Sequence, residues 1–188
     1  MPDKEDRKTS WNDRYQSKSY NPLLPEPFLV DHIFSLKPGS VLDIACGEGR
    51  NSLFLAQMGF QVSAVDFSEV ALDRLRKTST ENNLIIDIIE SDLSNLDCLQ
   101  KLKKYDNIIV IHFKLGEDLL ERIPSLLSDD GIFLYCTFSH RQSEETAFPE
   151  EYCLKEGSLS DKKWALTLLK YSSFKDIRGY HDGYLFRR

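Results

Sequence analysis

The chain has 188 residues, of which 41% are hydrophobic and 29% are charged, with a formal net charge of −6. This composition is typical of a globular protein and excludes a mainly disordered chain, and the length suits one domain with its own core. The negative charge disfavours long nucleic acids as partners, whereas a protein substrate stays open.

The apolar segments have the length of strands, and none approaches the length of a membrane span. Residues 1–10 are mostly polar or charged, so we expect no secretory signal peptide. The cysteines are scattered without the spacing of metal ligands, which predicts reduced thiols and no metal site: Cys46, Cys98, Cys136 and Cys153. These features together predict a cytoplasmic protein without membrane contact.

The first 36 residues predict a helical N-terminal cap. Ser10 is predicted to begin a short helix, and three residues with helical spacing share one of its faces: Trp11, Arg14 and Tyr15. The segment Pro25-Glu26-Pro27 interrupts the chain before a second predicted helix over residues 28–36.

Apolar runs and helix signals then alternate along the chain. The predicted strands cover residues 41–45, 60–65, 84–89, 108–112 and 132–138. The predicted helices cover residues 51–58, a segment that begins after Ser68, residues 96–102 and residues 117–127. Such alternation predicts a parallel sheet covered by helices on both faces and joined by right-handed crossovers.

The C-terminal part predicts a helix that begins at Ser160 or Asp161 and ends at Leu169, followed by a hairpin. The hairpin strands are residues 174–180 and 184–187, with a turn at His181-Asp182-Gly183. The fold class is therefore α/β. We expect one domain over 1–188, in which residues 40–188 form a Rossmann-like, doubly wound, mostly parallel seven-stranded sheet with a C-terminal antiparallel hairpin.

A glycine turn carries the strongest chemical signal. Gly47 and Gly49 follow a buried strand and precede a helix, which lets the backbone approach a ligand and presents N–H groups at the helix start. Asp66 comes 19 residues after Gly47, at the end of the next predicted strand. A carboxylate there can accept two hydrogen bonds from a ribose diol.

A glycine turn with a distal acid suits a dinucleotide as well as S-adenosylmethionine. Three features favour the second ligand: Asp43 lies inside the first strand, Ser52 replaces a third glycine, and Asp92 follows the third strand. Extra carboxylates contribute nothing to binding a pyrophosphate, whereas they suit a ligand with a sulfonium and an ammonium group.

The stretch from Val41 to Phe67 resembles motif I and the acidic loop of class I S-adenosylmethionine-dependent methyltransferases. Residues 45–51, 61–68 and 11–15 are similar to the small-molecule branch, which includes the tellurite-resistance and thiopurine methyltransferases. The likeness in element order covers nearly the whole chain, and its specific motifs are confined to residues 11–15 and 41–93.

The resemblance implies roles at the methionine end of the ligand. Asp43 would hold the ammonium group directly or through water, and Gly47 and Gly49 would admit the methionine backbone. Arg14 and Tyr15 would lie over the site, with Arg14 a candidate for the carboxylate.

The resemblance also implies roles at the adenosine end. Asp66 would bind the ribose hydroxyls and Phe67 would lie against the adenine. Asp92 would accept a hydrogen bond from the adenine amino group, and the Leu93 N–H would meet the ring. Ala45 is a further predicted cofactor-binding residue, at a position where the class often has glycine and this branch usually has alanine.

His112 is the candidate catalytic residue, because it ends an apolar strand beside the expected crevice. Lys114 stands where relatives often have a histidine, which weakens the case for a base there. Structural interpretations stay open: Asp43 as a turn cap, Tyr15 as an anchor of the terminus, and His112 as a core histidine.

The resulting hypothesis is in-line methyl transfer from S-adenosylmethionine to a small molecule, with S-adenosylhomocysteine as the product. Two alternatives stay open, namely an NAD(P)-linked oxidoreductase and a non-catalytic S-adenosylmethionine-binding protein. Base methylation is disfavoured because no Asn-Pro-Pro-Tyr-type motif follows the fourth predicted strand.

Overall fold

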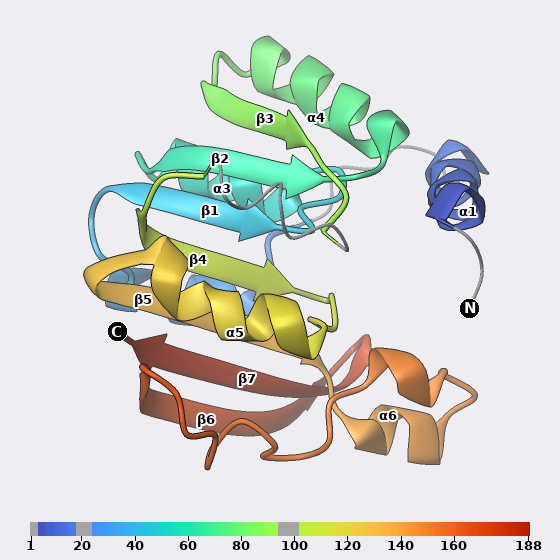
Figure 1. Ribbon diagram of the computed structural model, residues 1–188. Coiled ribbons are helices and arrows are strands. Elements are labelled where there is room, and N and C mark those ends of the chain that lie inside the picture. The colour runs from blue at the N-terminus through green and yellow to red at the C-terminus, as the bar shows by residue number, and fades with distance from the viewer. Residues whose placement is uncertain (1–3, 18–23, 94–101) are drawn as a thin grey trace.

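A twisted sheet forms the middle of the computed structural model, which describes residues 4–17, 24–93 and 102–188 (Figure 1). Within these residues the sheet has seven strands in the order β3-β2-β1-β4-β5-β7-β6. Their bounds are β1 Ser40–Ile44, β2 Gln61–Asp66, β3 Ile86–Glu90, β4 Tyr105–Ile111, β5 Leu127–Phe138, β6 Thr167–Asp176 and β7 Gly179–Arg187. Strands β1 to β5 pair in parallel, and β7 runs antiparallel to β5 and β6. The predicted sheet with its C-terminal hairpin is confirmed.

Helices cover both faces of the sheet, with α5 in front of it and α3 behind it in Figure 1. The α-helices are α1 Lys4–Ser17, α2 Pro27–Asp31, α3 Arg50–Gln57, α4 Glu69–Glu81, α5 Glu117–Leu126 and α6 His140–Glu145. Two short 3-10 helices are η1 Ile33–Ser35 and η3 Glu150–Tyr152. None of the described helices combines the length and the apolar character needed to cross a bilayer.

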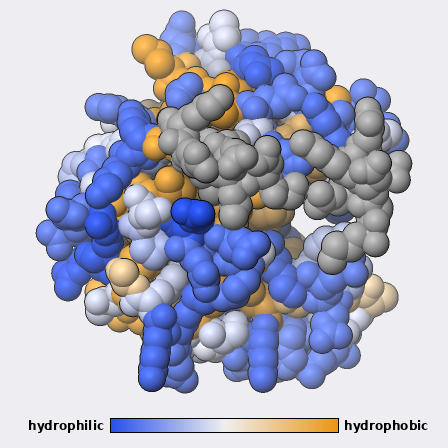
Figure 2. Space-filling view, in the orientation of Figure 1, coloured by the Kyte–Doolittle hydropathy of each residue, from blue (hydrophilic) through white to orange (hydrophobic). Residues whose placement is uncertain are grey.

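The core consists of two main layers, one on each face of the sheet. Along β4, Ile108 and Val110 pack in the layer that contains α5, whereas Ile109 and Ile111 pack in the layer that contains Phe28 of α2. Successive side chains of a strand point to opposite faces, so a strand covered on both faces is apolar throughout. The face seen in Figure 2 is mainly hydrophilic, with hydrophobic residues in scattered patches.

The strand order reverses between β1 and β4. From β1 the chain continues to β2 on one side, and it later returns to add β4 on the other. Ligands of open α/β sheets bind outside the carboxyl ends of the strands at such a point. We call the edge where β1 to β4 end the carboxyl edge. Helix α1 lies there, since Asn12 Oδ1 accepts a 2.7 Å hydrogen bond from Ser68 Oγ at the start of α4.

The prediction for the C-terminal region was wrong in two respects. Residues 160–166 form a turn and irregular backbone rather than a helix, and Leu168 already pairs with Phe186 across β6 and β7. The hairpin turn lies at Ile177-Arg178, between the paired residues Asp176 and Gly179. The Asp-Gly signal failed because Gly183 lies inside β7 against Phe28, where a Cβ atom would come within 2.5 Å of the ring.

The N-terminal predictions also need correction. Helix α1 continues through Ser10, because the charged residues before it are good helix formers. The helix expected over 28–36 is divided into α2 and the 3-10 turn η1. The helix predicted at 96–102 lies outside the described residues except for Leu102.

Candidate functional site

The turn after β1 has a left-handed backbone at three residues. The φ angles are 59° at Ala45, 55° at Gly47 and 77° at Gly49, and α3 begins at the next residue, Arg50. Glycine adopts this region without the steric cost of a side chain. The turn therefore brings its backbone N–H groups to the carboxyl edge, directly before a helix N-terminus.

Asp66, the last residue of β2, fixes this turn in place. It is buried, and its Oδ2 atom accepts a 2.8 Å hydrogen bond from the Gly47 N–H. Its Oδ1 atom accepts a 2.9 Å hydrogen bond from the N–H of Ser68, which caps α4 as predicted. Burial raises the pKa of Asp66, and the backbone hydrogen bonds offset part of that rise. A carboxylate has about four acceptor positions, so Asp66 keeps capacity for a ligand.

Asp43 lies beneath the same turn and is buried. Its Oδ2 atom accepts a 2.6 Å hydrogen bond from Ser52 Oγ. Burial, together with the nearby charge of Asp66, raises the pKa of Asp43 to about 7, although Ser52 and Arg50 act in the opposite direction. A bound cation would favour the ionised form of such a carboxyl. The chemistry of Asp43 and Asp66 therefore fits a cationic ligand such as S-adenosylmethionine.

Helix α1 brings Tyr15 onto the glycine turn. A Cβ atom built on Gly47 would lie 2.7 Å from the Tyr15 hydroxyl oxygen, so the phenol rests directly on that residue. Burial and the charge of Asp66 raise the pKa of Tyr15. Arg14 points elsewhere, because its exposed guanidinium lies 4.9 Å from the ring centre of Trp11. The Tyr15 side chain thus packs against the glycine turn, whereas the Arg14 side chain lies at the surface.

Gly49 serves packing as well as the shape of the turn. A Cβ atom there would lie 2.2 Å from Cδ1 of Leu75 in α4. The resemblance implied a ligand role for Gly49, and the structure adds a packing role.

The predicted adenosine-side residues lie next to Asp66. Phe67 follows it and is partly buried. The N–H of Ser91 donates a 2.8 Å hydrogen bond to the Asp66 carbonyl. Asp92, the next residue, therefore lies close to the end of β2. The Leu93 side chain packs against the core layer on the α5 face. Phe67 and Asp92 are thus brought to the end of β2, while the Leu93 side chain points into the core.

His112 is not part of this group but lies beside it at the carboxyl edge. Since Ile44 pairs with Val110, the residues after β4 run alongside the start of the glycine turn. His112 has a φ of 56°, and its N–H donates a 2.8 Å hydrogen bond to the Cys136 carbonyl. Its ring lies 4.9 Å from that of Phe138, measured between centres.

A fully buried carboxylate, Glu26, joins His112 to two arginines. Its Oε2 atom lies 2.7 Å from His112 Nε2, 3.0 Å from Arg50 Nη2 and 2.6 Å from Arg178 Nη1. Its Oε1 atom accepts a 2.8 Å hydrogen bond from Arg178 Nη2, and its N–H donates one of 2.9 Å to Asn51 Oδ1. Glu26 was not predicted from the sequence, since the Pro-Glu-Pro segment indicated only a break and Arg178 lies 152 residues away.

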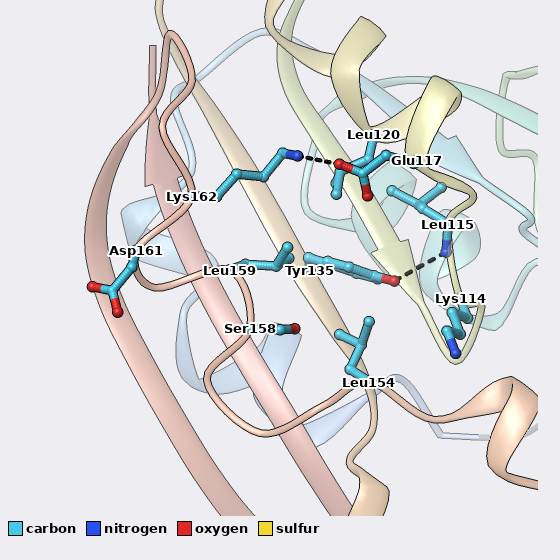
Figure 3. Close-up of a pocket in the computed structure, with 10 residues that line it drawn as sticks. All are labelled: Lys114, Leu115, Glu117, Leu120, Tyr135, Leu154, Ser158, Leu159, Asp161 and Lys162. Carbon is cyan, nitrogen blue, oxygen red and sulfur yellow. Dashed lines mark hydrogen bonds and ion pairs between the residues drawn. The ribbon is translucent and has the colours of Figure 1, made fainter.

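A separate cavity of about 350 Å³ lies between α5, β5 and the segment 154–162 (Figure 3). Leu115, Leu159 and Tyr135 form its apolar part, and the ion pair of Lys162 with Glu117 lies at its rim. Tyr135 fixes the loop after β4 by accepting a 3.0 Å hydrogen bond from the Leu115 N–H. None of the predicted site residues lines this cavity, which lies on the α5 face.

Comparisons with known proteins agree with this geometry. A probable S-adenosyl-L-methionine-dependent methyltransferase TehB of Haemophilus influenzae is 32% identical over 117 residues, which is 61% of this chain and 39% of that protein. A 23S rRNA (uracil(747)-C(5))-methyltransferase of Pyrococcus abyssi is 31% identical over 124 residues, which is 65% of this chain and 28% of that protein. The chain thus spans less than half the length of these curated relatives.

The solved structure of TehB from Haemophilus influenzae has the same fold. It matches with a TM-score of 0.70 and 20% identity, over 97% of this chain and 67% of that one. The model of the family described as tellurite resistance protein TehB matches residues 9–133, which include the glycine turn, Asp43, Asp66 and His112. The chain therefore belongs to the TehB family.

Proposed function

We propose that the chain binds S-adenosylmethionine at the glycine turn and transfers its methyl group to a small-molecule acceptor. The observation that carries this proposal is the convergence of Asp43, Asp66 and Gly47 at one point of the carboxyl edge. The family and the names of the relatives support the same cofactor. The described cysteines are free thiols, which supports a reducing, cytoplasmic site of action.

In this proposal the residues bind the two ends of the cofactor separately. Asp43 receives the methionine ammonium group, and the left-handed turn at Ala45, Gly47 and Gly49 lets the methionine part lie against the backbone. Tyr15 covers the turn from α1. Arg14, on the same helix, is the candidate for the methionine carboxylate once its guanidinium turns from Trp11 toward the site.

Four further residues receive the adenosine part. Asp66 uses its remaining acceptor capacity for the ribose hydroxyls. Phe67 and Asp92 hold the adenine ring and its amino group, and the Leu93 N–H meets the ring. When bound, the cofactor supplies an electrophilic methyl group, so the protein mainly has to align the acceptor with it and exclude water.

Calorimetry tests the proposal with three ligands, namely S-adenosylmethionine, S-adenosylhomocysteine and NAD. Binding of the first two without NAD is the expected result, whereas binding of NAD alone would support the oxidoreductase alternative. Formation of S-adenosylhomocysteine with a panel of small acceptors then separates an enzyme from a non-catalytic binder. An RNA arm belongs in the panel, because a relative is named as an rRNA methyltransferase.

A further inference from the structure

Glu26 and His112 form a largely buried pair beside the glycine turn. The His112 side chain is 17% exposed and that of Glu26 is not exposed, and their closest atoms, Nε2 and Oε2, lie 2.7 Å apart. Burial alone would raise the pKa of Glu26. The hydrogen bond from His112 and the charges of Arg178 and Arg50 outweigh that effect, so the pKa of Glu26 lies below its usual value.

An ionised carboxylate has no proton to donate, so the proton in this pair belongs to Nε2 of His112. The neutral ring then has its lone pair on Nδ1, which makes no hydrogen bond to any described residue. The backbone bond to Cys136 and the edge contact with Phe138 hold the ring in place. The geometry thus selects one tautomer of His112.

His181 does not compete for Glu26. Its ring centre lies 5.1 Å from that of His112, and its Nδ1 atom lies 3.5 Å from Asp176 Oδ1. Burial, and next the nearby charge of His112, lower the pKa of His181 to about 4, so it is neutral near pH 7. His112 is therefore the histidine of this cluster that Glu26 orients.

The cations around the pair are already neutralised. Arg178 binds Glu26 through two nitrogen atoms, and its Nη2 atom also donates a 2.8 Å hydrogen bond to Asp176. Arg50 binds Glu26 at 3.0 Å. The carboxylates of Glu26 and Asp176 balance the guanidinium groups of Arg50 and Arg178. These four side chains therefore have no surplus positive charge that would bind an oxyanion.

We propose that Glu26 is a positioning residue that presents Nδ1 of His112 as a proton acceptor, and that the methyl acceptor is a neutral nucleophile bearing a proton. This inference rests on the proposed function. The acceptor X–H, a thiol, amine or hydroxyl, forms a bond to the methyl carbon and passes its proton to His112, while the electron pair of the carbon–sulfur bond leaves with the thioether. Glu26, which accepts the hydrogen bond from Nε2, then stabilises the imidazolium.

The first experiment measures the tautomer of His112 by ¹⁵N NMR of the imidazole nitrogens, with the signals assigned from the His112→Asn variant. We expect the Nε2–H form in the unaltered chain at a pH where the ring is neutral, and a mixture of tautomers in Glu26→Gln. The Nδ1–H form in the unaltered chain would overturn the inference. This measurement needs no Glu26 variant, so it stands even where Glu26→Gln does not fold.

The second experiment measures methyl transfer to dithiothreitol, a primary amine, catechol and tellurite. We expect activity with one or more of the neutral acceptors, and a fall in kcat of about 10²- to 10⁴-fold in both His112→Asn and Glu26→Gln, with little change in KM. Matched controls are His140→Asn and Glu144→Gln, a histidine and a carboxylate 3.4 Å apart on α6, which should keep full activity.

S-adenosylhomocysteine binding separates the two possible failures. If the unaltered chain does not bind S-adenosylhomocysteine, the proposed function itself is contradicted. Normal binding together with transfer to tellurite alone, unchanged in His112→Asn, contradicts this inference and leaves the proposed function standing.

Discussion

The backbone N–H of Gly47 donates a 2.8 Å hydrogen bond to Oδ2 of Asp66, 19 residues later in the chain. This bond joins the end of β1 to the end of β2, and the second oxygen of Asp66 binds the start of α4 through Ser68. A single carboxylate therefore holds both the glycine turn and a helix N-terminus. Substitutions at Asp66 should change the ligand site and the fold around it together.

Replacing Asp66 by alanine should weaken S-adenosylmethionine and S-adenosylhomocysteine binding by about 1.5–3 kcal/mol, the range for hydrogen bonds to a charged group. It should also lower the unfolding free energy, since the N–H groups of Gly47 and Ser68 lose their partner. Calorimetry and urea unfolding measure the two effects. Asp129→Ala is the matched control, because Asp129 is exposed at the opposite end of the sheet. Unchanged affinity in Asp66→Ala would show that Asp66 is not part of the site.

Gly47→Ala tests the contact with Tyr15. An alanine at a left-handed position costs about 1–2 kcal/mol, and the new Cβ atom would also lie 2.7 Å from the Tyr15 hydroxyl. We expect a loss of stability and of cofactor affinity beyond that of Gly59→Ala, a control with a φ of 89° and no atom within 4 Å of the new Cβ.

The double variant Gly47→Ala/Tyr15→Phe isolates this clash. Phenylalanine lacks the hydroxyl, and the next phenol atom lies at an ordinary 3.6 Å from the Cβ position. Thermal unfolding should recover the excess loss in the double variant. If it does not, Tyr15 is not the residue that limits the space above Gly47.

The parallel part of the fold was predictable because its signals are local. The strands that end at Ile44 and Asp66 are apolar runs covered on both faces, and Ser68 caps α4 as its position suggests. The hairpin was predicted, but its turn was misplaced because a tertiary contact decides the position of Gly183. Gly183 lies under Phe28, which comes 155 residues earlier, so its local preference for a turn is overridden.

The cofactor side of the site was more predictable than the acceptor side. Asp43 and Asp66 follow from strand ends next to a glycine turn, a pattern read within 24 residues of sequence. Glu26 could not be predicted, because its partners His112 and Arg178 lie 86 and 152 residues away and no local pattern connects them. A buried ion cluster is a product of the tertiary fold.

The raised pKa of Asp43 predicts a pH dependence of stability. The folded protein holds this proton up to about pH 7, whereas the unfolded chain releases it at the ordinary value of 3.8. The contribution of Asp43 is therefore fully present below that value, and it is lost as the pH rises through about 7. Thermal unfolding without ligand should show this decline, and Asp43→Asn should reduce it, leaving the smaller part due to Asp66.

The same group predicts proton release on ligand binding. A cationic ligand favours the ionised form of Asp43, so binding at about pH 6 should release a proton and affinity should rise toward pH 7. Calorimetry in two buffers of different ionisation enthalpy measures this release. Asp43→Asn should abolish most of it, and equal release in both proteins would show that another group titrates.

Gly183→Ala tests how the hairpin is seated on α2. The new Cβ atom would lie 2.5 Å from Cε2 of Phe28, whose ring also stacks on that of Phe174 in β6 at a ring-centre distance of 5.8 Å. Overpacking of this kind costs about 1–3 kcal/mol, measured as a lower urea midpoint. Gly116→Ala is the control, because no atom lies within 4 Å of its Cβ position.

The second variant in this test is Phe28→Leu, which makes room for the alanine. The double variant Gly183→Ala/Phe28→Leu should be more stable than the sum of the two single effects predicts, since residues in contact show coupling. Strict additivity would mean that Phe28 is not what requires glycine at position 183. Glu26 directly precedes α2 in the chain, so a shift of α2 should also move Glu26. We therefore expect the same variants to shift the ¹⁵N signals of His112, whose ring is hydrogen-bonded to Glu26.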